Sequence, residues 1–507
     1  MNQLKAGAIL NYINIAVNII LGLLYTPYML DMLGQNEYGL YSLVASVISY
    51  LTLLDFGFGS AVVRYTAKYR AEGKIREQWE MFGMFFIVYL VLGMIAFIAG
   101  MGLYYNVDNL FDRTMTASDL NQARIMMLLL VVNLAVTFPL SMFGSIITAY
   151  ENFIFQKVVT LIRLLASTGV IVILLFWGYK AVALVVVHTI FNIGYLIVNF
   201  LYARYKLQIK VLFSNFNLGL IKEISVYSFW QFLNSIMDKI YWSTGQFILG
   251  SLVGTVAVAI FSVAITLQSM YMTFSGAIAS VMLPRVTTMV AQNASNEDIS
   301  DLFIRTGRIQ NIVMSLILVG FIVFGYSFIT LWAGADYSDS YLITVIFFAA
   351  LYIPLIQNTG IAILQARNQQ RFRCLVYVAI SIVSLFCQIW LAKLWGALGV
   401  AIAVGGALLI GQGLIINIYY GKVQRIDIPK FWREILRMSV MPIILAVAGL
   451  LLLQNVELNT WLKLGTAIVV FMMIYIPLIW RFSLNNHERQ LISVPINKII
   501  NKCRVRY

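Results

Sequence analysis

Charged side chains are scarce in this sequence. Of its 507 residues, 11% are Asp, Glu, Lys or Arg, whereas 61% are hydrophobic, and the mean hydropathy is +0.86. Water-soluble domains carry about 25% charged residues. The shortage of charge excludes a protein made mainly of water-soluble domains and predicts a chain that folds in lipid.

Residues that build catalytic and metal centres are also few. The sequence has two His and three Cys residues, and the spacing of Cys374, Cys387 and Cys503 fits neither a metal motif nor a disulfide framework. It contains no P-loop for ATP, no dinucleotide-binding loop and no nucleophile elbow. We therefore expect no catalytic residue, no metal and no cofactor. An Na⁺ or H⁺ gradient, the membrane potential or the substrate gradient is then the expected energy source.

Long apolar runs occupy most of the chain. A membrane-spanning helix needs about 20 apolar residues, and the sequence predicts about fourteen such helices. The expected spans are 7–30, 38–61, 81–103, 123–149, 158–178, 182–202, 224–250, 252–283, 309–331, 342–365, 374–394, 397–420, 439–454 and 461–480. The first run has spanning length and no small-residue cleavage site after a short core, so we expect a membrane helix rather than a signal peptide.

Basic residues fall mainly in alternate loops. Of the 35 Lys and Arg residues, one lies deep in a span and five lie on one side of the membrane, while all others lie on the opposite side. The six are Lys239 and, in the poorly charged loops, Arg113, Arg124, Lys180, Lys393 and Lys463. Because cytoplasmic loops carry the basic excess, both termini are predicted to be cytoplasmic. The net charge of +14 then reflects topology and lipid contact, not nucleic-acid binding.

A shift of 220 residues superposes the pattern of the first two spans on that of the seventh and eighth. This predicts an all-α membrane protein of two six-helix lobes, related as a parallel pseudo-twofold repeat, plus two extra C-terminal helices. The predicted parts are an N-lobe (1–205, helices 1–6), a cytoplasmic linker (206–223), a C-lobe (224–421, helices 7–12), helices 13–14 with their preceding cytoplasmic loop (422–480), and a basic cytoplasmic tail (481–507).

Polar side chains form the same stripe in the first and the seventh span. Steps of three and four residues place them on one helix face, and the 220-residue shift maps one stripe onto the other. The stripes are Asn11, Asn14 and Asn18, and Gln231, Asn234 and Asp238. Polar groups in hydrocarbon are unfavourable unless they face water or protein, so the stripes predict a substrate pathway. Amides that hold helices together are the alternative.

Ionisable residues inside spans are further candidate sites. Asp238 is a candidate for proton or sodium coupling and Lys239 for phosphate binding, with a structural ion pair as the alternative. Asp55 is a second ion-coupling candidate, unless it caps a broken helix or pairs with Arg64. Arg163 either lines the cytoplasmic half of a cavity or reaches to the interface. Arg64 is included among the substrate contacts, although headgroup anchoring is favoured for it.

The N-terminal 80 residues resemble a known family. The motifs are KAGAILNY at 5–12, YTPY at 25–28, LG at 33–34 with EYGLY at 37–41, and LDFGFG at 54–59 followed by RY at 64–65. They are similar to the start of polysaccharide-biosynthesis flippases of the O-antigen, capsule and teichoic-acid type. These flippases belong to the multidrug/oligosaccharidyl-lipid/polysaccharide (MOP) exporter superfamily.

The resemblance implies a transporter rather than an enzyme. Alternating access would move an undecaprenyl-(pyro)phosphate-linked glycan from the inner to the outer leaflet of a bacterial cytoplasmic membrane. Lys239 and Arg163 would then meet the phosphates, and the amides of the stripes the sugar. Membrane lipids and other polysaccharide-assembly membrane proteins are the implied partners. Peptidoglycan-precursor flippases of the superfamily carry arginines in the first helix, where this chain has asparagines.

Two alternatives remain at this point. A cation-coupled exporter of drugs or amphiphiles would use acidic residues such as Asp55 and Asp238. A membrane enzyme that builds the glycan is opposed by the short outer loops, the longest of which is predicted at 104–121, and by the lack of a catalytic constellation.

Overall fold

A computed structural model describes residues 3–214, 218–292, 294–367, 369–454, 456–485, 488–490 and 493. Within helices, the side chains at 4–5, 8, 218, 220–228, 230–231, 280–285 and 291 lie outside this description. The described residues form helices joined by short turns and contain no strand, which confirms the all-α fold class. The expected contacts of Gln231 and the tail after residue 493 fall outside the described part.

Ten helices of the described residues are long and apolar enough to cross a membrane, or eleven if the bent pair Ser340–Ile356 and Thr359–Ala366 forms one span. This confirms a multi-pass membrane protein. The number fourteen is not confirmed. One reason is that two long helices are each counted as one although a backbone break divides them in two. α1 (Gln3–Leu51) is broken at Gly34, whose φ of 73° is readily adopted only by glycine, and α14 (Arg371–Leu408) at Trp395 and Gly396.

Contacts divide the chain into two compact units. Unit 1 comprises Met1–Val263 and Tyr377–Ala403, and unit 2 comprises Ala264–Val376 and Val404–Tyr507. These bounds differ from those of the predicted lobes, because two long helices, α10 and α14, each contribute to both units. The division into an N-lobe and a C-lobe therefore stays a prediction.

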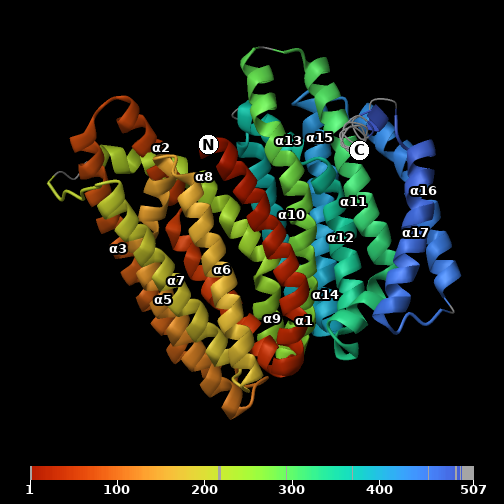
Figure 1. Cartoon of the computed structure of the whole chain (residues 1–507), viewed down its shortest axis with the longest axis horizontal. Helices are drawn as coiled ribbons and strands as arrows, with labels where there is room; N and C mark the ends of the chain where they lie inside the picture. The colour runs from red at the N-terminus through yellow and green to blue at the C-terminus, as the bar shows by residue number, and fades with distance from the viewer. Residues whose placement is uncertain are drawn as a thin grey trace, which may run out of the picture. The chain divides into compact units, whose positions relative to one another are not determined.

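Unit 1 is built around a group of long helices in which α3 packs on α5, α5 on α7 and α1 on α6 (Figure 1). Its other elements, in chain order after α1, are η1 (Thr52–Asp55), α2 (Phe58–Ala71), α3 (Ile75–Tyr105), α4 (Val107–Phe111), α5 (Ala117–Ala149), α6 (Phe153–Phe176), α7 (Ala181–Leu201), η2 (Tyr202–Lys206), α8 (Leu218–Trp242), α9 (Thr244–Leu252), the start of α10 (Thr255–Ala291) and the central part of α14, Tyr377–Ala403.

Large apolar side chains form a hydrophobic core in unit 1. Phe82, Phe85 and Tyr89 of α3 are almost fully buried against Phe143 and its neighbours on α5. The predicted linker lies on the same helix, where the backbone N–H of Leu212 donates to the Trp79 carbonyl at 3.1 Å. This packing fixes α5, which carries several of the polar side chains described below.

Unit 2 is organised by α11, which packs against α12 and α16, while α16 also packs against α17. Its elements, besides the remainder of α10 and α14, are α11 (Asn296–Trp332), η3 (Ala335–Tyr337), α12 (Ser340–Ile356), α13 (Thr359–Ala366), η4 (Leu409–Ile415), α15 (Ile416–Lys422), α16 (Ile428–Leu453) and α17 (Trp461–Phe482).

A buried ion triad joins the C-terminal helices to α11. Arg308 donates to both carboxylate oxygens of Glu488, at 2.6 and 2.9 Å, and to Glu434 at 2.7 Å. The side chains of Arg308 and Glu488 are 6% and 4% exposed. Because a buried charge is unfavourable without its partner, this triad fixes α16 and the segment after α17 against α11.

Candidate functional site

The amide stripe of α1 divides between two roles. Asn14 Nδ2 donates to the Lys157 carbonyl of α6 at 3.1 Å and to the Leu10 carbonyl at 3.0 Å. Asn11 Oδ1 instead accepts from Lys157 Nζ at 2.8 Å. Asn18 is exposed. Asn14 therefore joins two helices, whereas Asn11 holds a cation and Asn18 is open to ligand, water or lipid.

The stripe on α8 is described in part. Asn234 and Lys239 are half-buried, and Asp238 is exposed. The ring of Phe232, two residues before Asn234, lies 4.5 Å from the ring of Phe56, next to Asp55. The structure thus brings α8 close to the broken segment that carries Asp55.

A polar network surrounds Arg163 on α6. Arg163 Nη1 donates to Asn192 Oδ1 of α7 at 3.0 Å, and the guanidinium lies 4.8 Å from the centre of the Tyr195 ring. Asn192 Nδ2 in turn donates to Asn133 Oδ1 and Thr137 Oγ1 of α5, both at 2.9 Å. The network therefore joins three neighbouring helices around one guanidinium.

The charge of Arg163 is balanced by dipoles and not by a carboxylate. Within the described part of the chain, no carboxylate oxygen lies within 4 Å of its guanidinium, although Arg163 lies in a helix long and apolar enough to span. A guanidinium has five N–H donors, and Asn192 accepts from one of its nitrogens. The site can therefore accept an anion such as a phosphate.

Asp55 lies where the helix after Gly34 ends. The following Phe56 and Gly57 have φ of 49° and 74°, and helix α2 starts after them. The Asp55 carboxylate lies close to the Tyr89 hydroxyl and to the Gly57 backbone N–H. This arrangement fits capping of a helix break and leaves ion coupling a prediction. Arg64 lies beside the Tyr65 ring, 5.9 Å from its centre.

A set of polar contacts joins the break within α1 to the start of α5 and to the turn between α9 and α10. Asn36 Nδ2 donates to Asp119 Oδ1 at 3.0 Å, and Thr255 is hydrogen-bonded to Asn36. Thr114 Oγ1 donates to the Gly250 carbonyl at 2.6 Å. We call Asn36, Thr114, Asp119, Gly250 and Thr255 the loop cluster. It ties the break after the first span to the start of α10 within unit 1.

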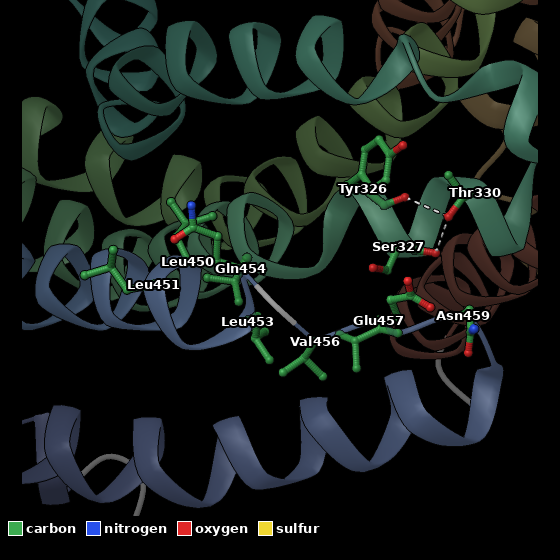
Figure 2. A pocket seen from close by; sticks show the side chains of 12 residues that line it. Tyr326, Ser327, Thr330, Leu450, Leu451, Leu453, Gln454, Val456, Glu457 and Asn459 are labelled. Atoms are coloured by element: carbon green, nitrogen blue, oxygen red, sulfur yellow. Dashed lines mark hydrogen bonds between the residues drawn. The ribbon is translucent and has the colours of Figure 1, made fainter.

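Three cavities accompany these groups. One of about 570 Å³ in unit 1 is lined by Gly7, Asn11, Thr148, Phe153, Gln156, Lys157 and Thr160. In unit 2, one of about 670 Å³ lies between α11 and α16, where Tyr326, Ser327 and Thr330 stand near Glu457 and Asn459 (Figure 2). An apolar groove of about 290 Å³ runs between α11 and α17. Only the first contains a residue of the predicted site, Asn11.

The family assignment follows from comparison with known proteins. A family model described as polysaccharide biosynthesis protein matches residues 4–290, which is more than half of the chain. The chain belongs to the polysaccharide biosynthesis protein family. No curated protein matches the sequence.

Solved structures extend the assignment to the fold of the MOP superfamily. The lipid II flippase MurJ, in an inward closed conformation, matches with TM-score 0.70 and 17% identity over 94% of this chain and 98% of MurJ. A multidrug resistance MATE family transporter in an inward-facing conformation matches with TM-score 0.62 and 14% identity over 81% and 96%. A MOP superfamily transporter from Pyrococcus furiosus matches with TM-score 0.57 and 12% identity over 85% and 96%. These identities establish the fold alone, which is that of membrane transporters.

Several residues around the predicted site residues Arg163 and Asn11 were not identified from the sequence. Asn133 and Thr137 are four residues apart on α5, and Asn192 and Tyr195 are three residues apart on α7. The stripe argument used for the first span would have found both sets. Lys157 was assigned to a cytoplasmic loop, and only the packing of α1 on α6 reveals its contact with Asn11.

Metal ions in proteins are usually held by groups of acidic, His and Cys side chains. No group of three such residues stands together anywhere in the described ranges. The expectation of no bound metal or cofactor stays a prediction.

Proposed function

We propose that this protein is a flippase for a lipid-linked glycan. It translocates an undecaprenyl-(pyro)phosphate-linked oligosaccharide from the inner to the outer leaflet of a bacterial cytoplasmic membrane for surface polysaccharide assembly. Both termini are cytoplasmic, and neighbouring membrane proteins of polysaccharide assembly deliver or receive the substrate. The family supports the polysaccharide part of this proposal, and the fold supports membrane transport.

The environment of Arg163 carries the proposal. Its guanidinium lies in a spanning helix among amide, hydroxyl and aromatic groups, without a described carboxylate beside it. An intramembrane cation of this kind attracts an anionic group and repels a cationic drug. A (pyro)phosphate-linked glycan offers both the negative charge for Arg163 and hydroxyl groups for the surrounding amides.

The loop cluster supports alternating access. By the distribution of basic residues, these loops lie on the extracytoplasmic side. Direct hydrogen bonds among Asn36, Asp119 and Thr255 would close that side in one state and would have to break in the other. The energy to open them would come from the substrate gradient or an ion gradient.

The finer architecture belongs to the same proposal. Two six-helix lobes in parallel repeat, followed by two further helices, require fourteen spans. The breaks at Gly34 and Gly396 each lie between two expected spans, which supports counting the helices on either side separately. The helices α8 and α9 together cover most of the expected span 224–250.

Translocation in liposomes tests the proposal. The purified protein is reconstituted with a fluorescent polyprenyl-pyrophosphate oligosaccharide, and the label of one leaflet is followed as it becomes accessible from the other. We expect Arg163→Ala and Asn192→Asp to slow protein-dependent translocation about tenfold, because each removes one charge-assisted interaction with the substrate. Arg163→Lys should retain part of the rate, and the exposed Arg76→Ala is the matched control. Absence of translocation for every glycolipid tested overturns the proposal.

A cation-coupled exporter is the second candidate function. The half-buried Asp55, close to the Tyr89 hydroxyl, and the exposed Asp238 favour it, since both acids could bind Na⁺ or a proton. Uptake of a cationic dye by the same liposomes, lost in Asp55→Asn and unaffected by Arg163→Ala, would establish this function instead. A deletion strain then gains drug sensitivity and keeps its surface polysaccharide.

A further inference from the structure

The cavity of about 570 Å³ in unit 1 lies between α1 and α6. Asn11 is the one lining residue that also belongs to the site predicted from the sequence. Five of its seven lining residues carry polar side chains, and Phe153 supplies an aromatic wall. Its volume of about 570 Å³ is large enough for a phosphate group with part of a sugar or glycerol. The residues Gly7, Phe153 and Thr148 belong to the ends of three helices on the side predicted to be cytoplasmic.

Lys157 gives this cavity a positive charge. Its side chain is half-buried, and its Nζ donates to Asn11 Oδ1 at 2.8 Å. Among the side chains that the structure describes, no carboxylate oxygen lies within 4 Å of Nζ. An ammonium group has three N–H donors, so Asn11 leaves donors for a ligand. The half-buried ammonium group of Lys157 is therefore hydrogen-bonded to a neutral amide, that of Asn11.

The neighbouring amide also presents donors. Because a lysine can only donate, the atom of Asn11 that faces it is the oxygen, and the Asn11 NH₂ group is turned elsewhere. In contrast, the hydroxyls of Thr148 and Thr160 donate to Gln156 Oε1 and to the Gln156 carbonyl, at 2.7 and 2.8 Å. Their remaining lone pairs accept hydrogen bonds. Anion donors therefore concentrate at Lys157 and Asn11, and acceptors for hydroxyl groups lie on the other wall.

The start of α6 adds to the positive potential. Phe153 is the first residue of this 24-residue helix, and the side chain of Asn152 makes no capping hydrogen bond to it. The N–H groups of a first turn carry a partial positive charge that favours anions. Lys157 lies four residues into the helix, about 6 Å along its axis from the end that is predicted to be cytoplasmic.

We propose that Lys157 and Asn11 form a binding site for the phosphate headgroup of a membrane lipid on the cytoplasmic face, where the carrier lipid is loaded before translocation. As a loading site it rests on the proposed flippase function. The chemistry recognised is a phosphate ester at the membrane surface, and the carrier lipid or an anionic phospholipid can supply it. Asn14 positions the site, since it ties the Lys157 backbone to α1.

Lipid binding to the full-length protein in detergent tests this site. The probes are undecaprenyl pyrophosphate and, separately, dioleoylphosphatidylglycerol, measured as dissociation constants by native mass spectrometry. We expect Lys157→Gln to weaken binding of undecaprenyl pyrophosphate about tenfold or more, because a charge-assisted hydrogen bond is lost. Lys157→Arg should retain most of the affinity. Lys74→Gln, on the exposed loop between α2 and α3, is the matched control.

A second variant separates recognition from folding. Asn11→Asp is nearly isosteric and would form an ion pair with Lys157, so the melting temperature should stay equal to or above that of the wild type. The added carboxylate neutralises the cavity and repels phosphate, so binding should fall at least as much as in Lys157→Gln. Unchanged affinities in both variants for both lipids overturn the proposal.

The two probes identify the source of the phosphate. Loss of undecaprenyl pyrophosphate binding with unchanged phosphatidylglycerol binding supports the loading site. Equal loss for both lipids supports the phosphate site and assigns it to bilayer lipid, which removes the loading role. If the wild type translocates no glycolipid but binds phosphatidylglycerol through Lys157, the flippase function fails and the phosphate site stands. If translocation proceeds and neither variant changes lipid binding, the site fails and the function stands.

Discussion

Asn14 and Asn11 are one turn apart on α1 and perform different tasks. The NH₂ group of Asn14 donates hydrogen bonds to two backbone carbonyls, one of which belongs to α6. Asn11 accepts from a lysine and keeps its own donors for a ligand. The structural interpretation of the polar stripe therefore holds for Asn14, and a role of Asn11 in the substrate pathway stays a prediction. One side chain also has two tasks beside Arg163. Asn192 of α7 accepts a hydrogen bond from the guanidinium on α6, and its NH₂ group donates to Asn133 of α5.

We expect Asn14→Leu to destabilise the protein by about 1 kcal/mol, since interhelical hydrogen bonds in membranes contribute about 0.6–1.7 kcal/mol. The change removes the side-chain contact with the Lys157 carbonyl. Thermal unfolding in detergent measures the effect. Asn18→Leu, at an exposed position of the same stripe, is the control and should unfold at the wild-type temperature. Equal behaviour of the two variants would remove the structural role of Asn14.

The backbone break at Gly34 determines which residues of α1 contact α5. The φ of 73° at Gly34 turns the chain so that Asn36 reaches Asp119 at the start of α5. A few residues later, Gly39 faces the Thr255 carbonyl so closely that an added Cβ would overlap it. Close approach of α1 to the start of α10 thus depends on the absence of a side chain at Gly39.

Gly39→Leu should separate the loop cluster. We expect a cysteine placed at Thr255, which is buried, in a cysteine-free background to react several-fold faster with a membrane-impermeant maleimide when Gly39→Leu is present, because the contact of α1 with the start of α10 then no longer covers it. Gly102→Leu is the matched control, since an added Cβ at Gly102 would meet nothing within 4 Å. Labelling that is equal in the two backgrounds contradicts a closing role for the cluster.

Charge sets the orientation of the molecule as a whole. By the positive-inside rule, we expect the basic loops to face the cytoplasmic leaflet and the poorly charged loops to lie outside. Labelling of single cysteines in intact cells checks this. A cysteine in place of exposed Asp112 should react with an impermeant maleimide at once, and one in place of Gly73 only after the cells are permeabilised. The reverse pattern would invert the proposed direction of transport.

The buried triad is the main ionic link within unit 2. Arg308→Met leaves Glu488, which is 4% exposed, without its guanidinium partner, and we expect a loss of about 3 kcal/mol in unfolding free energy. Unfolding in denaturant, followed by tryptophan fluorescence, measures this loss. The double variant Arg308→Met/Glu488→Leu should recover a large part of it, because no unpaired charge then remains buried. A double variant no more stable than Arg308→Met would show that packing, rather than charge pairing, holds α16 and α17 in place.

The sequence by itself determined that this protein folds in lipid, that it is helical, and that it belongs to its family, because hydropathy and the N-terminal motifs are properties of neighbouring residues. It also placed Asn11 and Arg163 among the candidate site residues, since polar groups in apolar spans can be recognised from composition alone.

Only the tertiary structure decided which groups meet. Asn11 and Lys157 are 146 residues apart, and Arg308 and Glu488 are 180 apart. Their contacts depend on which helix packs against which, at what height and with what rotation, and no local pattern encodes these quantities. The same holds for the loop cluster, where Asn36 after the helix break, Asp119 of α5 and Thr255 of α10 come together from three segments. Packing therefore turned a stripe of amides into one structural contact and one cation-binding position.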